Sequence, residues 1–138
     1  MAEPIVSCRG LQRTYRSDTR ETSAVRGVDL DVAPGEWVAI MGPSGCGKSS
    51  LLHLLGGLDT PDAGTVTVDG HDLGRLSETG RALLRRTRIG YVFQFFNLVQ
   101  DFTVAENVEL PMLLAGANRA EARDRRHRLL EAVGLAEA

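Results

Sequence analysis

Hydrophobic and polar residues are spaced so that strands are predicted on both sides of one glycine-rich loop, and helices in the last third of the chain. Residues 5–11 and 25–32 have strand-like apolar positions, and the polar stretch 14–22 between them predicts a loop or hairpin turn. Residues 37–41 are continuously apolar and predict a third strand. Helical spacing follows the loop, at Leu51, Leu52, Leu54, Leu55 and Leu58. The order at the centre is therefore strand, glycine-rich loop, helix.

Turn residues divide the next part of the chain. Gly56-Gly57 predicts the end of the loop helix, and the Pro- and Asp-containing residues 59–64 predict a turn. Residues 65–68 alternate polar and apolar side chains, as in a half-exposed strand, and Asp69-Gly70 closes it. A short exposed helix over residues 77–88 and a buried strand over residues 89–93 follow.

Two capped helices are predicted at the end of the chain. Thr103 with Glu106 three residues later forms one capping-box signature, and Pro111 is expected to bend or restart that helix. Asn118 with Glu121 starts the last helix, which Gly134 ends.

Composition excludes several classes of protein. The 138 residues suit one domain, and the net charge of −2 creates no field that would attract nucleic acid, so no nucleic-acid partner is expected. No apolar run approaches the ~20 residues that a membrane span needs, and the first residues show no basic region followed by an apolar one, so export is not expected. Two cysteines form neither a disulfide framework nor a metal site, which fits a reducing cytoplasm.

The central loop carries the chemistry. It reads G-x-x-x-x-G-K-S, in full Gly42-Pro43-Ser44-Gly45-Cys46-Gly47-Lys48-Ser49-Ser50. Glycines let the backbone adopt positive φ and approach a ligand, so that successive N–H groups form an anion site at a helix N-terminus. The loop residues are therefore predicted to bind the phosphates of a nucleotide.

Two side chains of this loop have predicted roles. Lys48 would reach the β- and γ-phosphates as a point charge, and the hydroxyl of Ser49 would bind Mg²⁺. Lys48 is the only lysine in the sequence, beside 15 arginines. Because lysine and arginine are not interchangeable at a phosphate site, this usage supports nucleotide binding over a plain glycine-rich turn. Cys46 lies inside the same anion site, where a thiol is expected to be reactive and to be protected by nucleotide.

The chain resembles the ATP-binding domain of ABC transporters over essentially its whole length. The resemblance rests on Thr14-Tyr15, the phosphate loop, the strand over residues 65–68 and Tyr91-Val92-Phe93-Gln94, in that order and spacing. Residues 94–98 and 106–111 are similar to the subgroup that energises lipoprotein release and macrolide export.

The resemblance implies an α/β fold with a RecA-like P-loop NTPase core. Residues 1–35 and 62–75 would form an antiparallel β-subdomain, and residues 36–60 and 76–94 the core up to the loop at Gln94. Residues 95–138 would begin a helical subdomain.

Further roles are implied by the resemblance. Tyr15 would stack on adenine, with packing at a strand end as the alternative. Gln94 would contact Mg²⁺ and the attacking water, since a neutral amide orients water without competing for a proton. ATP and Mg²⁺ are the implied ligands, and ATP hydrolysis coupled to transport is the implied activity.

The same resemblance implies partners and a location. The segment after Gln94, with Phe95, Phe96, Leu98 and Phe102, would face membrane-spanning permease subunits, unless these side chains fill the subdomain core. A second ATP-binding subunit would pair head to tail with the first. The protein would then lie in the cytoplasm, at the inner face of the plasma membrane.

The sequence also departs from the family. It contains no L-S-G-G-Q motif, no second apolar strand ending in Asp-Glu and no switch histidine. We therefore expect the N-terminal, truncated part of a longer ATPase domain. For the 138 residues alone, the alternatives are MgATP binding without turnover and a non-functional fragment.

Other P-loop enzymes fit less well. A GTPase needs an N-K-x-D guanine reader, which cannot exist when Lys48 is the only lysine. A small kinase does not need the two early strands or the strand over residues 65–68.

Overall fold

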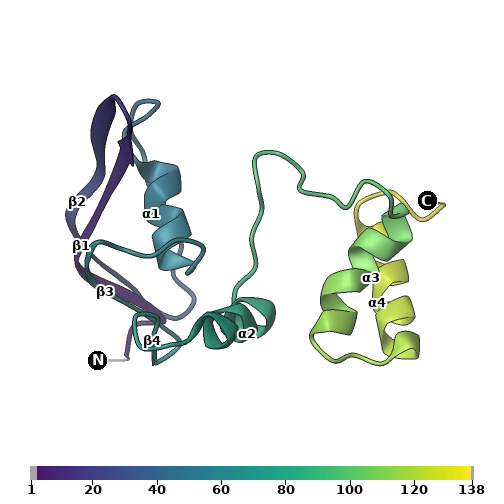
Figure 1. Cartoon of the computed structure of the whole chain (residues 1–138). Coiled ribbons are helices and arrows are strands. Elements are labelled where there is room, and N and C mark those ends of the chain that lie inside the picture. The colour runs from purple at the N-terminus through teal and green to yellow at the C-terminus, as the bar shows by residue number, and fades with distance from the viewer. Residues whose placement is uncertain (1–2, 138) are drawn as a thin grey trace. The chain divides into compact units, whose positions relative to one another are not determined.

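The computed structural model describes residues 3–137, which form two compact units (Figure 1). The first unit ends at Arg85 and the second begins at Arg86. The first contains a four-stranded sheet, the helix that follows the glycine-rich loop and most of the helix Glu78–Arg88, and the second contains the last two helices of the described residues. Each unit is described below by itself.

A four-stranded antiparallel sheet with the order β2-β1-β3-β4 forms one layer of the first unit. Its strands are β1 (Val6–Ser17), β2 (Arg20–Val32), β3 (Ala63–Val68) and β4 (His71–Asp72). This sheet confirms the antiparallel β-structure expected near the N-terminus. The two-residue strand β4 was not expected from the sequence.

The first two strands form a longer hairpin than the sequence pattern predicts. Residues 14–22 were expected to be a loop or hairpin turn, but only Asp18 and Thr19 are turn residues. Tyr15 pairs with Thr22 and Ser17 pairs with Arg20 across the ladder. Polar residues here lie in a strand because the end of a two-stranded ladder is open to water, so strand formation requires no apolar face.

Glycines allow a β-bulge and a tight turn in this sheet. The ladder between β1 and β3 shifts register between Arg9 and Gln12, where Gly10 and Gly64 have φ of 55° and 89°. A bulge of this kind requires residues that tolerate positive φ. Asp69 and Gly70, both with positive φ, form the predicted tight turn between β3 and β4.

The loop helix α1 (Lys48–Leu55) covers the sheet and contacts β1, β2 and β3. Its buried leucines, Leu51 and Leu54, lie among sheet residues that are also buried: Cys8, Leu11, Val25, Val66 and Val68. Gly56 caps the C-terminus of α1, as Gly56-Gly57 predicted. Helix α2 (Glu78–Arg88) confirms the short helix expected after Ser77, whose hydroxyl accepts a hydrogen bond from the N–H of Gly80 (3.1 Å).

Two predicted strands are absent from the structure. Residues 37–41 and residues 89–93 adopt neither helix nor strand, and Trp37 is 98% exposed. Val92, which was expected in a buried strand, is fully exposed. A strand exists only when a neighbour satisfies its backbone groups, and neither segment has a partner strand among residues 3–137.

In the second unit, α3 (Val104–Leu114) and α4 (Arg119–Ala132) contact each other. Both predicted capping boxes are present, at Thr103 with Glu106 and at Asn118 with Glu121. Hydrogen bonds from Thr103 lower the pKa of the Glu106 carboxyl. Helix α3 continues across Pro111, so the expected restart of the helix there is wrong. The lost N–H of Pro111 removes one intrahelical bond, which the flanking turns tolerate.

The end of α4 is as predicted. Gly134 adopts a φ of 75°, and its N–H donates to the carbonyl of Glu131 (3.0 Å). The N–H of Leu135 donates to the carbonyl of Leu130 (2.8 Å), which completes a Schellman motif. Within residues 3–137, no helix combines the length and apolar character needed to cross a bilayer.

Candidate nucleotide-binding site

The glycine-rich loop turns sharply before α1. Gly45 and Gly47 have φ of 78° and 99°, a left-handed conformation that a side chain would strain. The N–H of Cys46 donates to the carbonyl of Pro43 at 3.4 Å, which closes the loop on itself. The loop is therefore concave in the way that the glycine spacing predicts.

Lys48 lies across the mouth of this loop. Its Nζ donates to the carbonyl oxygens of Gly42 (2.9 Å) and Pro43 (2.8 Å), and Cys46 Sγ lies 3.8 Å away. The ammonium is thus held at the loop by neutral acceptors. Among residues 3–137 no carboxylate forms an ion pair with this ammonium, so its positive charge is not neutralised at the loop.

The start of α1 is left uncapped by side chains. Its N-cap residue is Gly47, which makes no side-chain hydrogen bond, and the first turn contains no acidic residue. The first N–H groups of a helix lack intrahelical partners and carry partial positive charge. The helix start therefore offers donors to an anion, and its first turn contains no acidic residue that would repel one.

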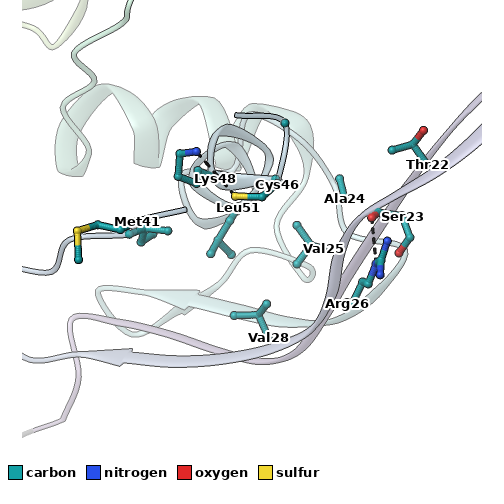
Figure 2. Close-up of a pocket in the computed structure, with 13 residues that line it drawn as sticks. Thr22, Ser23, Ala24, Val25, Arg26, Val28, Met41, Cys46, Lys48 and Leu51 are labelled. Carbon is teal, nitrogen blue, oxygen red and sulfur yellow. Dashed lines mark hydrogen bonds between the residues drawn. The ribbon is translucent and has the colours of Figure 1, made fainter. Parts of the chain in front are cut away.

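A hollow of about 660 Å³ opens beside the loop. Gly45, Cys46, Gly47 and Lys48 line one side, and β2 residues that include Thr22 and Val25 line the other (Figure 2). Figure 2 shows Lys48 and Cys46 at the N-terminal end of α1, and Val25 on the side of β2 toward this helix. The phosphate loop and the hairpin therefore border the same space.

The remaining loop residues differ in exposure. Pro43, Ser44 and Ser49 are exposed, and Ser50 is half-buried on α1. An exposed hydroxyl at Ser49, next to Lys48, has the chemistry of an oxygen ligand for a hard cation such as Mg²⁺. The residues present therefore fit a nucleotide with its metal.

Tyr15 belongs to the same unit but is engaged with a different group. Its hydroxyl donates to Asp59 Oδ2 (2.9 Å), and the Arg13 guanidinium lies 5.0 Å from the centre of its ring. Tyr15 is 39% exposed. The ring is therefore fixed at its polar end and covered on one face.

Sequence reasoning missed the cluster that holds Tyr15. Arg13 binds Asp59 through two nitrogens and Asp62 through a third, although residues 59–64 were predicted only as a turn. The pKa of Asp62 is lowered by the N–H of Thr14 and then by Arg13. Two aspartates in one turn after a helix could have indicated a bound cation. The arginine that they bind lies 46 positions before Asp59 and 49 before Asp62.

Gln94 lies in the second unit, at a bend, with an exposed side chain. Its role therefore stays a prediction. Nearby aromatic side chains are also exposed, with Phe95 at 77% and Phe96 at 87%. The alternative that they fill the core of the helical subdomain does not hold for the residues that the structure describes.

Comparison with known proteins gives a consistent result. A family model described as "ABC transporter" matches residues 25–138. The chain is 47% identical over 135 residues to the lipoprotein-releasing system ATP-binding protein LolD 2 of Caulobacter vibrioides, covering 98% of this chain and 59% of that protein. It is 48% identical over 134 residues to a LolD protein of Xanthomonas oryzae pv. oryzae, covering 97% and 55%.

A solved structure is also similar. The dimeric post-hydrolysis state of the ATP-binding cassette MJ0796, bound to ADP and Pi, matches with a TM-score of 0.85 and 37% identity. The match covers 91% of this chain and 56% of that one. This chain therefore spans less than two thirds of the length of the relatives it matches.

Proposed function

Because this chain belongs to the ABC transporter family, we propose that it binds MgATP as part of an ATPase that drives transport across a membrane. The proposed ligands of the phosphates are the loop residues: Gly42, Pro43, Ser44, Gly45, Cys46, Gly47, Lys48, Ser49 and Ser50. Lys48 binds the β- and γ-phosphates, and Ser49 binds Mg²⁺.

One observation carries this proposal. The ammonium of Lys48 lies at the mouth of a loop with left-handed glycines, where it donates to carbonyl oxygens that phosphate oxygens can replace. The uncapped start of α1 supplies further donors to the same place. A lysine in an ordinary surface turn is not expected to bind loop carbonyls beside the N-terminus of a helix.

Two further residues, one in each unit, have proposed roles in the full ATPase. Tyr15 stacks on the adenine in this proposal, which is supported by its position opposite Thr22, a residue that lines the hollow beside the loop, and by its partly exposed side chain. Gln94 orients the attacking water and contacts the metal in the full ATPase. Bound Mg²⁺ supplies charge neutralisation of the phosphates.

The proposed partners follow from the family and from exposed apolar residues. Relatives of the chain are named for a lipoprotein-releasing system, so we infer a complex of this kind, with membrane-spanning permease subunits and a second ATP-binding subunit. The exposed Phe95, Phe96, Leu98 and Phe102 are the proposed permease contact. The protein then acts at the inner face of the plasma membrane.

For these 138 residues by themselves, a narrower function is favoured. The sequence has no L-S-G-G-Q motif and no strand ending in Asp-Glu after Gln94. Phosphoryl transfer depends on placed charge around the γ-phosphate, and these residues supply only part of it. We expect the chain alone to bind MgATP without turnover.

Calorimetric titration with MgATP, run beside a steady-state phosphate-release assay, tests the proposal. Saturable binding without phosphate release is the expected result. Phosphate release that is lost in the Lys48→Ala variant would instead assign turnover to these residues. A folded chain that binds no MgATP at millimolar concentration contradicts the proposed function.

Cys46 gives an independent report of nucleotide in the loop. We expect N-ethylmaleimide to modify Cys46 in the free chain, and saturating MgATP to slow the reaction at least about tenfold, since the exposed thiol lies inside the phosphate site. Mass spectrometry of the digested protein measures both cysteines. Cys8 is the internal control, because it is 1% exposed and burial raises its pKa. Equal modification of Cys46 with and without MgATP counts against the proposed site.

A further inference from the structure

We propose that Arg13 is a positioning residue for nucleotide binding, which holds the ring of Tyr15 so that one face remains available to stack on the nucleobase. This inference rests on the proposed function, because it concerns how that site binds the base. Arg13 and its ion pairs with Asp59 and Asp62 would then contribute to nucleotide binding as well as to the stability of the sheet.

Arg13 is held by two carboxylates from the turn after α1. Its Nε and Nη2 donate to the two oxygens of Asp59 (3.0 and 2.8 Å), and its Nη1 donates to Asp62 (2.9 Å). The side chains of Arg13 and Asp59 are each 24% exposed. A bidentate pair in a partly desolvated setting fixes the plane of the guanidinium, which a lysine could not reproduce.

The same carboxylates bind the strand that carries Tyr15. Asp62 accepts the backbone N–H of Thr14 (2.6 Å), and Asp59 accepts the hydroxyl of Tyr15 (2.9 Å). Three consecutive residues of β1 are thus tied to one turn. The polar end of Tyr15 cannot turn toward a ligand without losing its acceptor.

The position of Arg13 determines which surface of Tyr15 remains available. The guanidinium carbon lies 5.0 Å from the ring centre and covers one face, as in a cation–π contact. With its hydroxyl occupied and one face covered, Tyr15 can offer a base only its other face. Thr22 lies opposite Tyr15 in the hairpin and lines the hollow beside Lys48, so Tyr15 lies one strand away from the wall of that hollow.

Two ligands separate the base from the phosphates in a test. Binding of MgATP and of magnesium tripolyphosphate by the whole chain is measured by calorimetry, and the ratio of the two dissociation constants reports the contribution of the nucleoside. Stacking of a base on an aromatic ring corresponds to about 5- to 150-fold in affinity. Arg13→Ala is expected to reduce the ratio at least about threefold, while tripolyphosphate affinity stays within about twofold of the unchanged chain.

Companion variants separate positioning from folding. Arg13→Lys keeps the positive charge but lacks the planar guanidinium. It is expected to lower the ratio as Arg13→Ala does, and to lower the melting temperature less than Arg13→Ala does. Tyr15→Ala is expected to give the lowest ratio. Arg9→Ala is the matched control, because Arg9 lies on the same strand and pairs with Asp31 at 2.6 Å, away from Tyr15. It should leave the ratio unchanged.

The outcomes distinguish the inference from the proposed function. If the Arg13 variants keep the ratio of the unchanged chain, or if Tyr15→Ala also keeps it, Arg13 does not position a base-binding ring. If the Arg13 variants weaken both ligands equally, the cluster serves only stability and the inference is wrong. If the unchanged chain binds neither ligand, the proposed function itself fails, and this inference fails with it.

Discussion

Lys48→Ala is expected to weaken MgATP binding at least about 100-fold, to a level at which calorimetry at millimolar nucleotide detects no saturation. The ammonium of Lys48 lies against the carbonyl oxygens of the loop, at 2.8 Å from Pro43 and 2.9 Å from Gly42. Charge-assisted hydrogen bonds contribute about 1.5–3 kcal/mol each, and Lys48 is expected to make more than one to the phosphates. Alanine leaves the loop backbone in place but removes these bonds.

Two further variants make this result specific. Arg75→Ala removes one positive charge from an 88%-exposed side chain that pairs with Asp72, so it controls for net charge and should bind MgATP like the unchanged chain. Lys48→Arg keeps the charge on a larger, planar group and is expected to recover little of the affinity. If Lys48→Ala bound MgATP within about threefold of the unchanged chain, the loop would not be a phosphate site.

Gly64→Ala is expected to destabilise the first unit by about 3 kcal/mol and to lower its melting temperature by at least about 10 °C. Gly64 has a φ of 89°, and a β-carbon there would lie 2.5 Å from the carbonyl oxygens of Arg9 and Gly10. Both atoms belong to the backbone of β1 at the register shift, so no side chain can move aside. Thermal unfolding followed by circular dichroism measures the effect.

Gly70→Ala separates the two causes of that destabilisation. Gly70 also has a positive φ, of 74°, but nothing lies within 4 Å of the position of its β-carbon. It should therefore show only the conformational cost, about 1 kcal/mol. Equal loss of stability in the two variants would mean that the close crossing of β1 and β3 at Gly64 does not exist.

Local chemistry could be predicted from the sequence where it depends on neighbours in the chain. The turn of the phosphate loop follows from glycines two positions apart, and both capping boxes follow from a polar residue and a glutamate at a spacing of three. The Schellman end of α4 follows in the same way from Gly134 and Leu135. The ABC family also follows from motifs that are short and ordered, and the comparisons confirm it.

Features that depend on contacts between residues far apart in the sequence could not be predicted. Residues 37–41 and 89–93 have the apolar composition of buried strands, but composition does not supply the neighbouring strand that such a segment needs. The ladder between Tyr15 and Thr22 is the opposite case, because pairing made a strand from polar residues. In the Arg13 cluster, Arg13 binds residues that lie 46 and 49 positions later in the chain. At such a separation the spacing of charges in the sequence does not predict an ion pair.

The bare start of α1 has a consequence for how the loop responds to its ligand. The helices α3 and α4 each carry their own side-chain acceptors at the first turn, whereas α1 begins at a glycine that has none. A phosphate bound there would accept hydrogen bonds from the free N–H groups of the first turn. Phosphate binding and the order of residues 48–51 would therefore stabilise each other. Nucleotide would then stabilise the first turn of this helix, which already contains the hydrogen bond from the N–H of Leu51 to the carbonyl of Gly47 (2.9 Å).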